Sequence, residues 1–168
     1  MNATVSNLTS GAILSWDERE NALPLPIDSS DPVVALALKS SDVISAIDNE
    51  TLQVTGLTAP KYALTIDKKP VATLSSQDLA AGINLATLPT PMLAQAGQVL
   101  ALTNQHVGIH TTRFRSVLAP LQFDAYPEVQ QALSRLVAAL DDEDASWVTK
   151  QRAAAQPIVH HFSLAPAQ

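Results

Sequence analysis

The alternation of apolar and polar positions predicts strands at both ends of the chain and in its middle. Residues 1–20 alternate loosely around Ser10-Gly11, which predicts two short strands joined by a turn. Between residues 51 and 75, apolar side chains recur at every second position in short runs separated by Gly56 and by a turn at 67–70. We therefore expect a three-stranded antiparallel meander there, and PIVHHFSL near the C-terminus is expected to add an edge strand.

Helical spacing and capping residues predict helices between these strands. Asp31 followed by Pro32 predicts the start of a short helix within 31–48, and Ser75 or Ser76 predicts another that ends at Gly82 in a left-handed conformation. Thr90-Pro91 predicts the start of a long helix over about 90–108. A further helix is expected at 127–140, then a break at the acidic run 141–144, because acidic side chains favour a helix N-terminus, and a last helix at 144–154.

This order of elements predicts an α+β fold in a single domain, residues 1–168. The β-rich part would be 1–75 with the short helix 31–48 inside it, the helical part 76–156, and the final strand 157–164. We expect a small antiparallel sheet packed against two or three longer helices. A chain of 168 residues is long enough to bury one core.

Composition excludes several classes of protein. With 46% apolar and 15% charged residues, the chain is expected to be folded and globular. A net charge of −6 and the lack of any basic cluster argue against a nucleic-acid partner. There is no cysteine, so disulfides, thiolate nucleophiles and cysteine zinc sites are excluded. The N-terminal residues do not resemble a signal peptide, and no apolar run reaches the ~18–20 residues of a membrane span.

His106 and His110 lie four positions apart on the predicted long helix. This spacing lets two imidazoles reach one metal ion, but the sequence between them lacks the glutamate of an HExxH motif and offers no third ligand. The alternative is that both are structural and favour the C-terminal end of the helix, where cations are stabilised. We predict no bound metal and no cofactor, and keep both residues as binding candidates.

Two arginines follow the long helix, on what the pattern indicates is a short strand. Arg113 and Arg115 could bind a substrate carboxylate, or they could pair with an internal acid such as Asp48 or Asp67. His160 and His161 are adjacent in the final strand and should face opposite sides, which makes a shared ion unfavourable.

The sequence lacks the parts of a complete catalytic site. No Gly-x-Ser-x-Gly elbow is present, and none of the serines has glycine-rich surroundings that would let a substrate approach. A glycosidase would need two acids on separate elements around a cleft, which spacing along a chain does not reveal.

Several phrases resemble a known family: SWDERENALPLPID, DPVVALALKSSDVISAIDNETLQVTGL, KYALTIDKKPVATLSSQDLAAGINLATLPTPMLAQA and QRAAAQPIVHHFSL. They are similar to the C-terminal portion of bacterial SGNH (GDSL-type) hydrolases, over roughly residues 12–164. The resemblance implies an esterase or lipase whose flavodoxin-like core carries Gly-Asp-Ser, Gly-x-Asn-Asp and Asp-x-x-His blocks. It also leaves a periplasmic or secreted location open for the parent enzyme, while the compartment of this chain stays unassigned.

The catalytic blocks of that family do not map onto this sequence. Gly-Asp-Ser is absent, and none of the four histidines has an aspartate three residues before it. Gly82-Ile83-Asn84 matches part of Gly-x-Asn-Asp, but Leu85 replaces the acid, so Asn84 is kept only as a binding candidate.

Three hypotheses about function follow from the sequence. The chain is the accessory C-terminal part of such a hydrolase, inactive alone, with the catalytic core as its partner and a small ester as their shared substrate. Alternatively, it is a free-standing module that binds a ligand or a protein. The third hypothesis is a metal-binding protein that uses His106 and His110.

Overall fold

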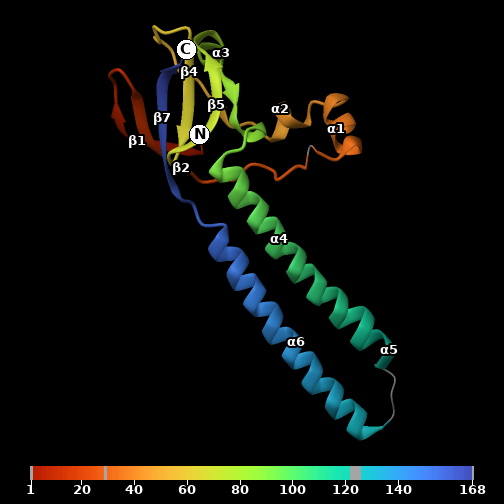
Figure 1. The fold of residues 1–168 in the computed structure, drawn as a ribbon. Helices are drawn as coiled ribbons and strands as arrows, with labels where there is room; N and C mark the ends of the chain where they lie inside the picture. The colour runs from red at the N-terminus through yellow and green to blue at the C-terminus, as the bar shows by residue number, and fades with distance from the viewer. Residues whose placement is uncertain (1, 29, 122–125, 168) are drawn as a thin grey trace. The chain divides into compact units, whose positions relative to one another are not determined.

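The computed structural model describes residues 2–28, 30–121 and 126–167, and its contacts divide the chain into two compact units (Figure 1). The sheet unit comprises 1–96 and 157–168, and the helical unit comprises 97–156. We predicted one domain for the whole chain, and we describe the two units separately.

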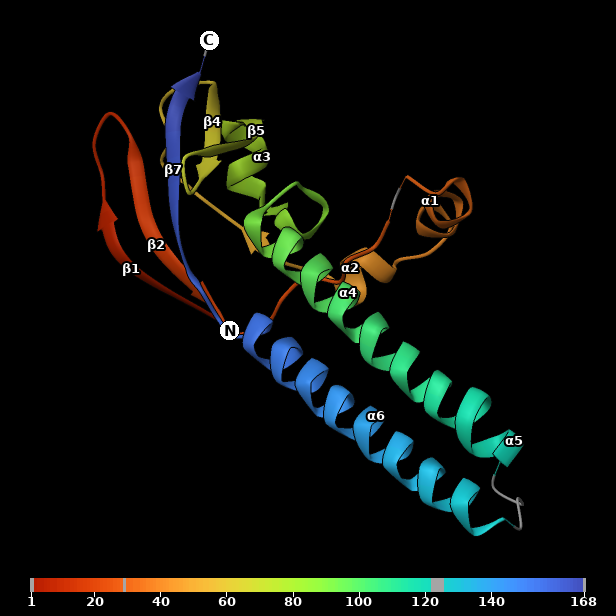
Figure 2. The same cartoon turned by 60° about the horizontal axis from the view of Figure 1, so that its bottom comes forward.

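The sheet unit is built on a five-stranded antiparallel sheet in the order β1-β2-β7-β4-β5. Its strands are β1 (Ala3–Thr9), β2 (Leu14–Glu20), β4 (Lys61–Ile66), β5 (Lys69–Ser75) and β7 (Val159–Ala167). The C-terminal strand β7 lies in the centre of the sheet, between β2 and β4 (Figure 2). Our prediction of an edge strand was wrong, because both sides of β7 carry strand partners that are distant in sequence.

The β4–β5 hairpin follows from its two-residue turn. Asp67 and Lys68 both have positive φ, 50° and 65°, as the two central residues of a tight antiparallel turn require. The turn sets Ile66 opposite Lys69, and alternation then buries Tyr62, Leu64 and Ile66 on one face.

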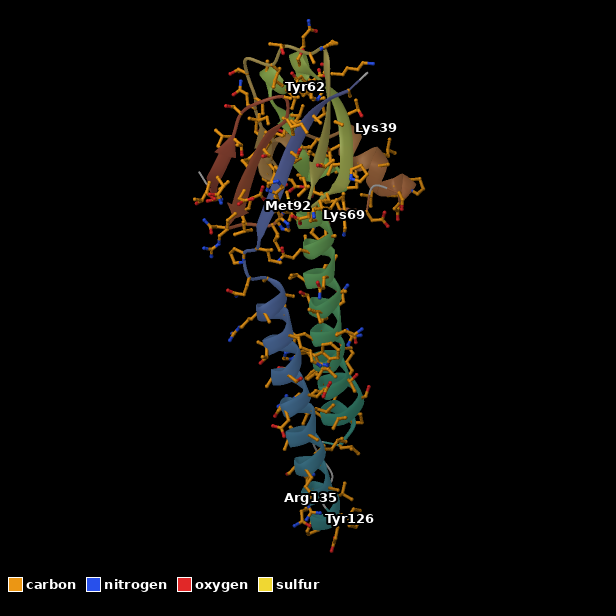
Figure 3. All side chains as sticks on the ribbon, turned by 60° about the vertical axis from the view of Figure 1, so that its left-hand side comes forward. Lys39, Tyr62, Lys69, Met92, Tyr126 and Arg135 are labelled. Carbon is orange, nitrogen blue, oxygen red and sulfur yellow. The ribbon has the colours of Figure 1, made fainter. Side chains whose placement is uncertain are left out.

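The core of the sheet unit lies on that face. Leu64 and Leu164 are opposite each other on β4 and β7, and both are fully buried. Trp16 of β2 stacks on Phe162 with 5.1 Å between ring centroids. Leu79 from helix α3 (Ser76–Ala81) and Met92 from the start of helix α4 (Pro91–Thr111), which Figure 3 labels, belong to the same cluster. Each buried side chain of this size contributes about 1.5–3 kcal/mol through removal of apolar surface from water.

The predicted meander of 51–75 was partly wrong. β3 (Thr51–Leu52) does not pair with β4; it pairs with β6 (Ile83–Asn84) in a separate two-stranded sheet. Gly82 allows this pairing, because its φ of 96° turns the chain from α3 back toward β3. The 3-10 turn Leu85–Thr87 follows β6 directly.

Two short helices, α1 (Pro32–Lys39) and α2 (Val43–Ile47), lie between β2 and β3. Asp31 caps α1 as predicted, since its carboxylate accepts hydrogen bonds from the backbone N–H groups of Val33 and Val34. Neither helix has a buried residue.

The helical unit contains a long hairpin. Helix α4 (Pro91–Thr111) continues into a π-helical segment (Thr112–Leu118) and then α5 (Ala119–Leu121), and α6 (Pro127–Ala154) returns alongside α4 (Figures 1 and 2). Arg113 and Arg115 therefore lie on a helical turn, and the predicted strand was wrong. Helix α6 has no break at 141–144, because these acidic side chains lie in the middle of a continuous helix, where Asp141 and Asp144 meet partners from the facing segment.

The antiparallel sheet and the helices confirm the predicted α+β class. Among the helices that the structure describes, none has both the length and the apolar composition that crossing a membrane requires.

Candidate functional sites

The first candidate site joins three side chains across the helical hairpin. His106 and His110 lie one turn apart on α4, and Asp144 faces them from α6. The less exposed positions of α6 include 133, 137, 140, 144, 147 and 151, which follow the alternating spacing of three and four that antiparallel helix pairs use. This spacing places Asp144 on the side of α6 that faces α4.

The three groups converge through one atom each. Asp144 Oδ1 lies 2.9 Å from His106 Nε2 and 3.3 Å from His110 Nε2. The two Nε2 atoms are 2.9 Å apart. Side chains of His106 and Asp144 are about one quarter exposed (24% and 23%) and that of His110 is 58% exposed, so the cluster is open to solvent from one side.

Other polar pairs cross the hairpin on either side of this cluster. Gln151 donates to the Thr103 hydroxyl at 2.6 Å, and Arg113 Nε contacts Asp141 Oδ1 at 2.6 Å. Arg113 thus pairs with an internal acid, as one alternative held, although that acid is Asp141 and neither Asp48 nor Asp67. Arg115 is exposed in the π-helical segment.

Asn84 is committed to local structure. Its side-chain oxygen accepts hydrogen bonds from the backbone N–H of Glu50 at 2.9 Å and of Ala86 at 3.0 Å, while its amide donates to the Asp48 carbonyl at 2.7 Å. All of these partners are backbone groups of the sheet unit, so Asn84 fastens the 48–50 segment to the turn after β6.

The second candidate site is an acidic pocket of the sheet unit. Strand alternation places Glu18 and Glu20 on the same face of β2 as the buried Trp16. Glu50, which precedes β3, joins them in a pocket of ≈ 380 Å³ whose lining also includes Leu23, Asp48, Leu52 and Leu85. The wall of the pocket is therefore apolar in part and strongly acidic in part.

Carboxyl groups in this pocket titrate abnormally. Burial, followed by the negative charge of Glu20, raises the pKa of Glu50 to about 8. Burial likewise raises the pKa of Glu20. No described group donates a hydrogen bond to the buried carboxyl oxygens of Glu50. The raised pKa keeps the Glu50 carboxyl protonated up to a higher pH than an exposed glutamate.

The acidic pair meets one requirement of a glycosidase, because two acids from separate segments line one pocket. However, burial in the pocket wall is the first cause of both raised pKa values, and the negative charge of Glu20 acts on Glu50 only as the second. We therefore regard the pair as a buried acidic feature of the pocket wall.

The imidazoles of the described residues contact acids or each other. His160 Nδ1 lies 2.7 Å from Asp67 Oδ2, and His161 Nδ1 lies 2.7 Å from Asp17 Oδ1. His106 and His110 share Asp144. None of these contacts in the described part of the chain joins an imidazole to a serine hydroxyl, so they do not assemble a nucleophile with its base.

Sequence reasoning missed three residues of these sites, Asp144, Glu20 and Glu50. The signal for Asp144 was present, because it lies in the acidic run that we interpreted as a helix start. Nothing in the spacing of Glu20 and Glu50 indicates that they meet, since thirty residues and two short helices separate them.

Comparisons with known proteins identify a structural neighbour. No family model and no curated protein matches the chain. A solved structure described as a gut microbial diltiazem-metabolizing enzyme superposes with a TM-score of 0.78 at 23% sequence identity. The match covers 99% of this chain and 46% of that chain, so this chain spans just under half of the enzyme's length. At this identity the likeness is one of fold.

Proposed function

We propose that this chain is the accessory portion of an SGNH (GDSL-type) ester hydrolase, inactive alone, which shapes or covers an active site contributed by a separate catalytic core. The observation that carries the proposal is the extent of the structural match. Nearly the whole chain superposes on less than half of a larger chain that is described as an enzyme. The sequence resemblance to the C-terminal portion of these hydrolases points the same way.

The chemistry of the described residues supports a non-catalytic role. The contacts of the four histidines lead to carboxylates or to each other, and the sequence lacks Gly-Asp-Ser and Asp-x-x-His. Asn84 matches part of an oxyanion block, but its side-chain amide is hydrogen-bonded to backbone groups of Glu50 and Asp48.

Exposed apolar side chains on α1 and α2 support a role that involves a partner. Val33 and Leu36 of α1, which we call the α1 patch, are 74% and 68% exposed, and Ile47 of α2 is 68% exposed. Helix α1 consists almost entirely of apolar residues and buries none of them, an arrangement that isolated proteins disfavour. We assign this patch to the contact with the catalytic core.

The coding sequence that flanks this chain tests the proposal. An upstream reading frame, separate or continuous with this chain, that encodes Gly-Asp-Ser and Asp-x-x-His is the expected result. The core should then hydrolyse a short-chain ester faster when this chain is present. Leu36→Ser should weaken that effect, because it removes an exposed apolar side chain of α1. It leaves the core of the sheet unit, which contains Leu64, unchanged. A flanking region without these blocks would contradict the proposal.

A further inference from the structure

We propose that His106, His110 and Asp144 bind one divalent transition-metal ion of the zinc class. Such a site requires a small set of ligands, here two imidazole nitrogens and one carboxylate oxygen that reach a common point. The helical hairpin supplies this set from two segments that are separated by more than thirty residues. This inference is independent of the accessory role proposed above.

The distances fit an ion after a small adjustment. Tetrahedral zinc with bonds of about 2.0–2.1 Å separates its ligand atoms by about 3.3 Å. Here the three separations are 2.9, 2.9 and 3.3 Å. A shift of a few tenths of an ångström, within the reach of partly exposed side chains, therefore opens the triangle enough for the ion.

The three polar atoms also point toward one another, as the ligands of a single ion do. His106 Nε2, His110 Nε2 and Asp144 Oδ1 each present a lone pair or a proton to the same small volume. Protons can satisfy some of the three contacts, whereas a divalent ion satisfies all of them at once. Asp144 Oδ1 is buried and accepts no hydrogen bond with good geometry from any described group, although both imidazoles lie close to it.

The donor set selects the kind of ion. Two nitrogens and one oxygen suit Zn²⁺, Co²⁺ or Ni²⁺, whereas Mg²⁺ and Ca²⁺ prefer oxygen ligands throughout. Three protein ligands leave a fourth position for water, and the 58% exposure of His110 gives the ion access. Because the ligands come from α4 and α6, the ion would join the two helices.

Calorimetric titration of the untagged chain with Zn²⁺ in metal-free buffer tests the site. We expect one zinc ion per chain, and binding at least about 10- to 100-fold weaker in each of His106→Ala, His110→Ala and Asp144→Asn, since even the partners of metal ligands cost that much when removed. Asp144→Asn keeps the size of the side chain, so it separates loss of a ligand from loss of fold. Bound Co²⁺ should show the intense visible absorption of a tetrahedral site in the unchanged chain and lose it in Asp144→Asn.

His161→Ala is the matched control, because it removes another histidine that contacts an aspartate, in the sheet unit. It should bind zinc as the unchanged chain does, and Mg²⁺ should not bind to either. Absence of zinc binding would overturn the proposal. Binding that survives all three ligand substitutions, or binding that His161→Ala abolishes, would do the same.

Discussion

At the residue scale, the candidate sites depend on which carboxylate lies next to each arginine or histidine side chain. The sequence allowed Arg113 to pair with an internal acid, and it does, but only the folded hairpin identifies Asp141 as that acid. The same holds for Asp144, which becomes a partner of two histidines because α6 runs without interruption through the acidic segment.

Glu50→Gln should stabilise the sheet unit at high pH. The raised pKa of Glu50 means that the folded chain keeps a proton between its ordinary pKa of 4.5 and about 8, where the unfolded chain has lost it. Stability contributed by this group is therefore present below the ordinary pKa and is lost as the pH rises through about 8. Solvent screening of a half-exposed carboxyl limits the expected gain in Glu50→Gln to about 1 kcal/mol at pH 8.5.

Urea unfolding followed by Trp16 fluorescence, in a Trp147→Phe background, measures this gain. The difference between Glu50→Gln and the unchanged chain should become small near pH 4.5. Glu143→Gln, an exposed substitution in the helical unit, is the control and should show no such pH dependence. A gain that is equal at both pH values would refute the buried acidic pair.

At the element scale, local signals predicted most starts and ends, and long-range pairing decided the rest. Asp31, Ser75 and Thr90 cap helices as the sequence predicted, because capping needs only a few neighbouring residues. The central place of β7 and the pairing of β3 with β6 were not predictable, because both depend on contacts between residues distant in sequence. We misinterpreted the acidic run 141–144 as a helix start, because the preference of acidic residues for helix ends contributes less free energy than the packing of a long helix.

Gly82→Ala should destabilise the sheet unit by about 1–2 kcal/mol. The φ of 96° disfavours any residue with a Cβ, and a Cβ built there would lie 3.1 Å from Thr51 Cγ2, on the strand that pairs with β6. Gly108→Ala is the opposite case, since nothing lies within 4 Å of its Cβ in the interior of α4. That control should stabilise its helix by about 0.5–1 kcal/mol. Equal effects of the two substitutions, in urea or thermal unfolding, would contradict this account of the turn.

At the scale of the whole molecule, the chain contains a sheet unit with an apolar core and a helical hairpin. Polar pairs join the two arms of the hairpin to each other. The α+β class was predictable, because it needs only the kinds of element and their order. Part of the candidate sites was predictable, because the spacing of His106 and His110 and the position of Arg113 can be read from the sequence. The acidic pocket was not, because it forms only where β2 and the 48–50 segment come together in the fold. In the hairpin cluster two imidazoles contact a carboxylate, carboxyl groups line the acidic pocket, and our proposal assigns catalysis to a separate core.

Hydrolysis of p-nitrophenyl acetate by the chain alone, metal-free and then zinc-loaded, tests this central claim most directly. The account predicts the rate of the matched buffer blank in both states, because under our proposal a separate catalytic core supplies the nucleophile and the base. Turnover well above the blank that one serine substitution abolishes would contradict it. Turnover that requires zinc and disappears in Asp144→Asn would also contradict it, and would make the hairpin cluster a catalytic site.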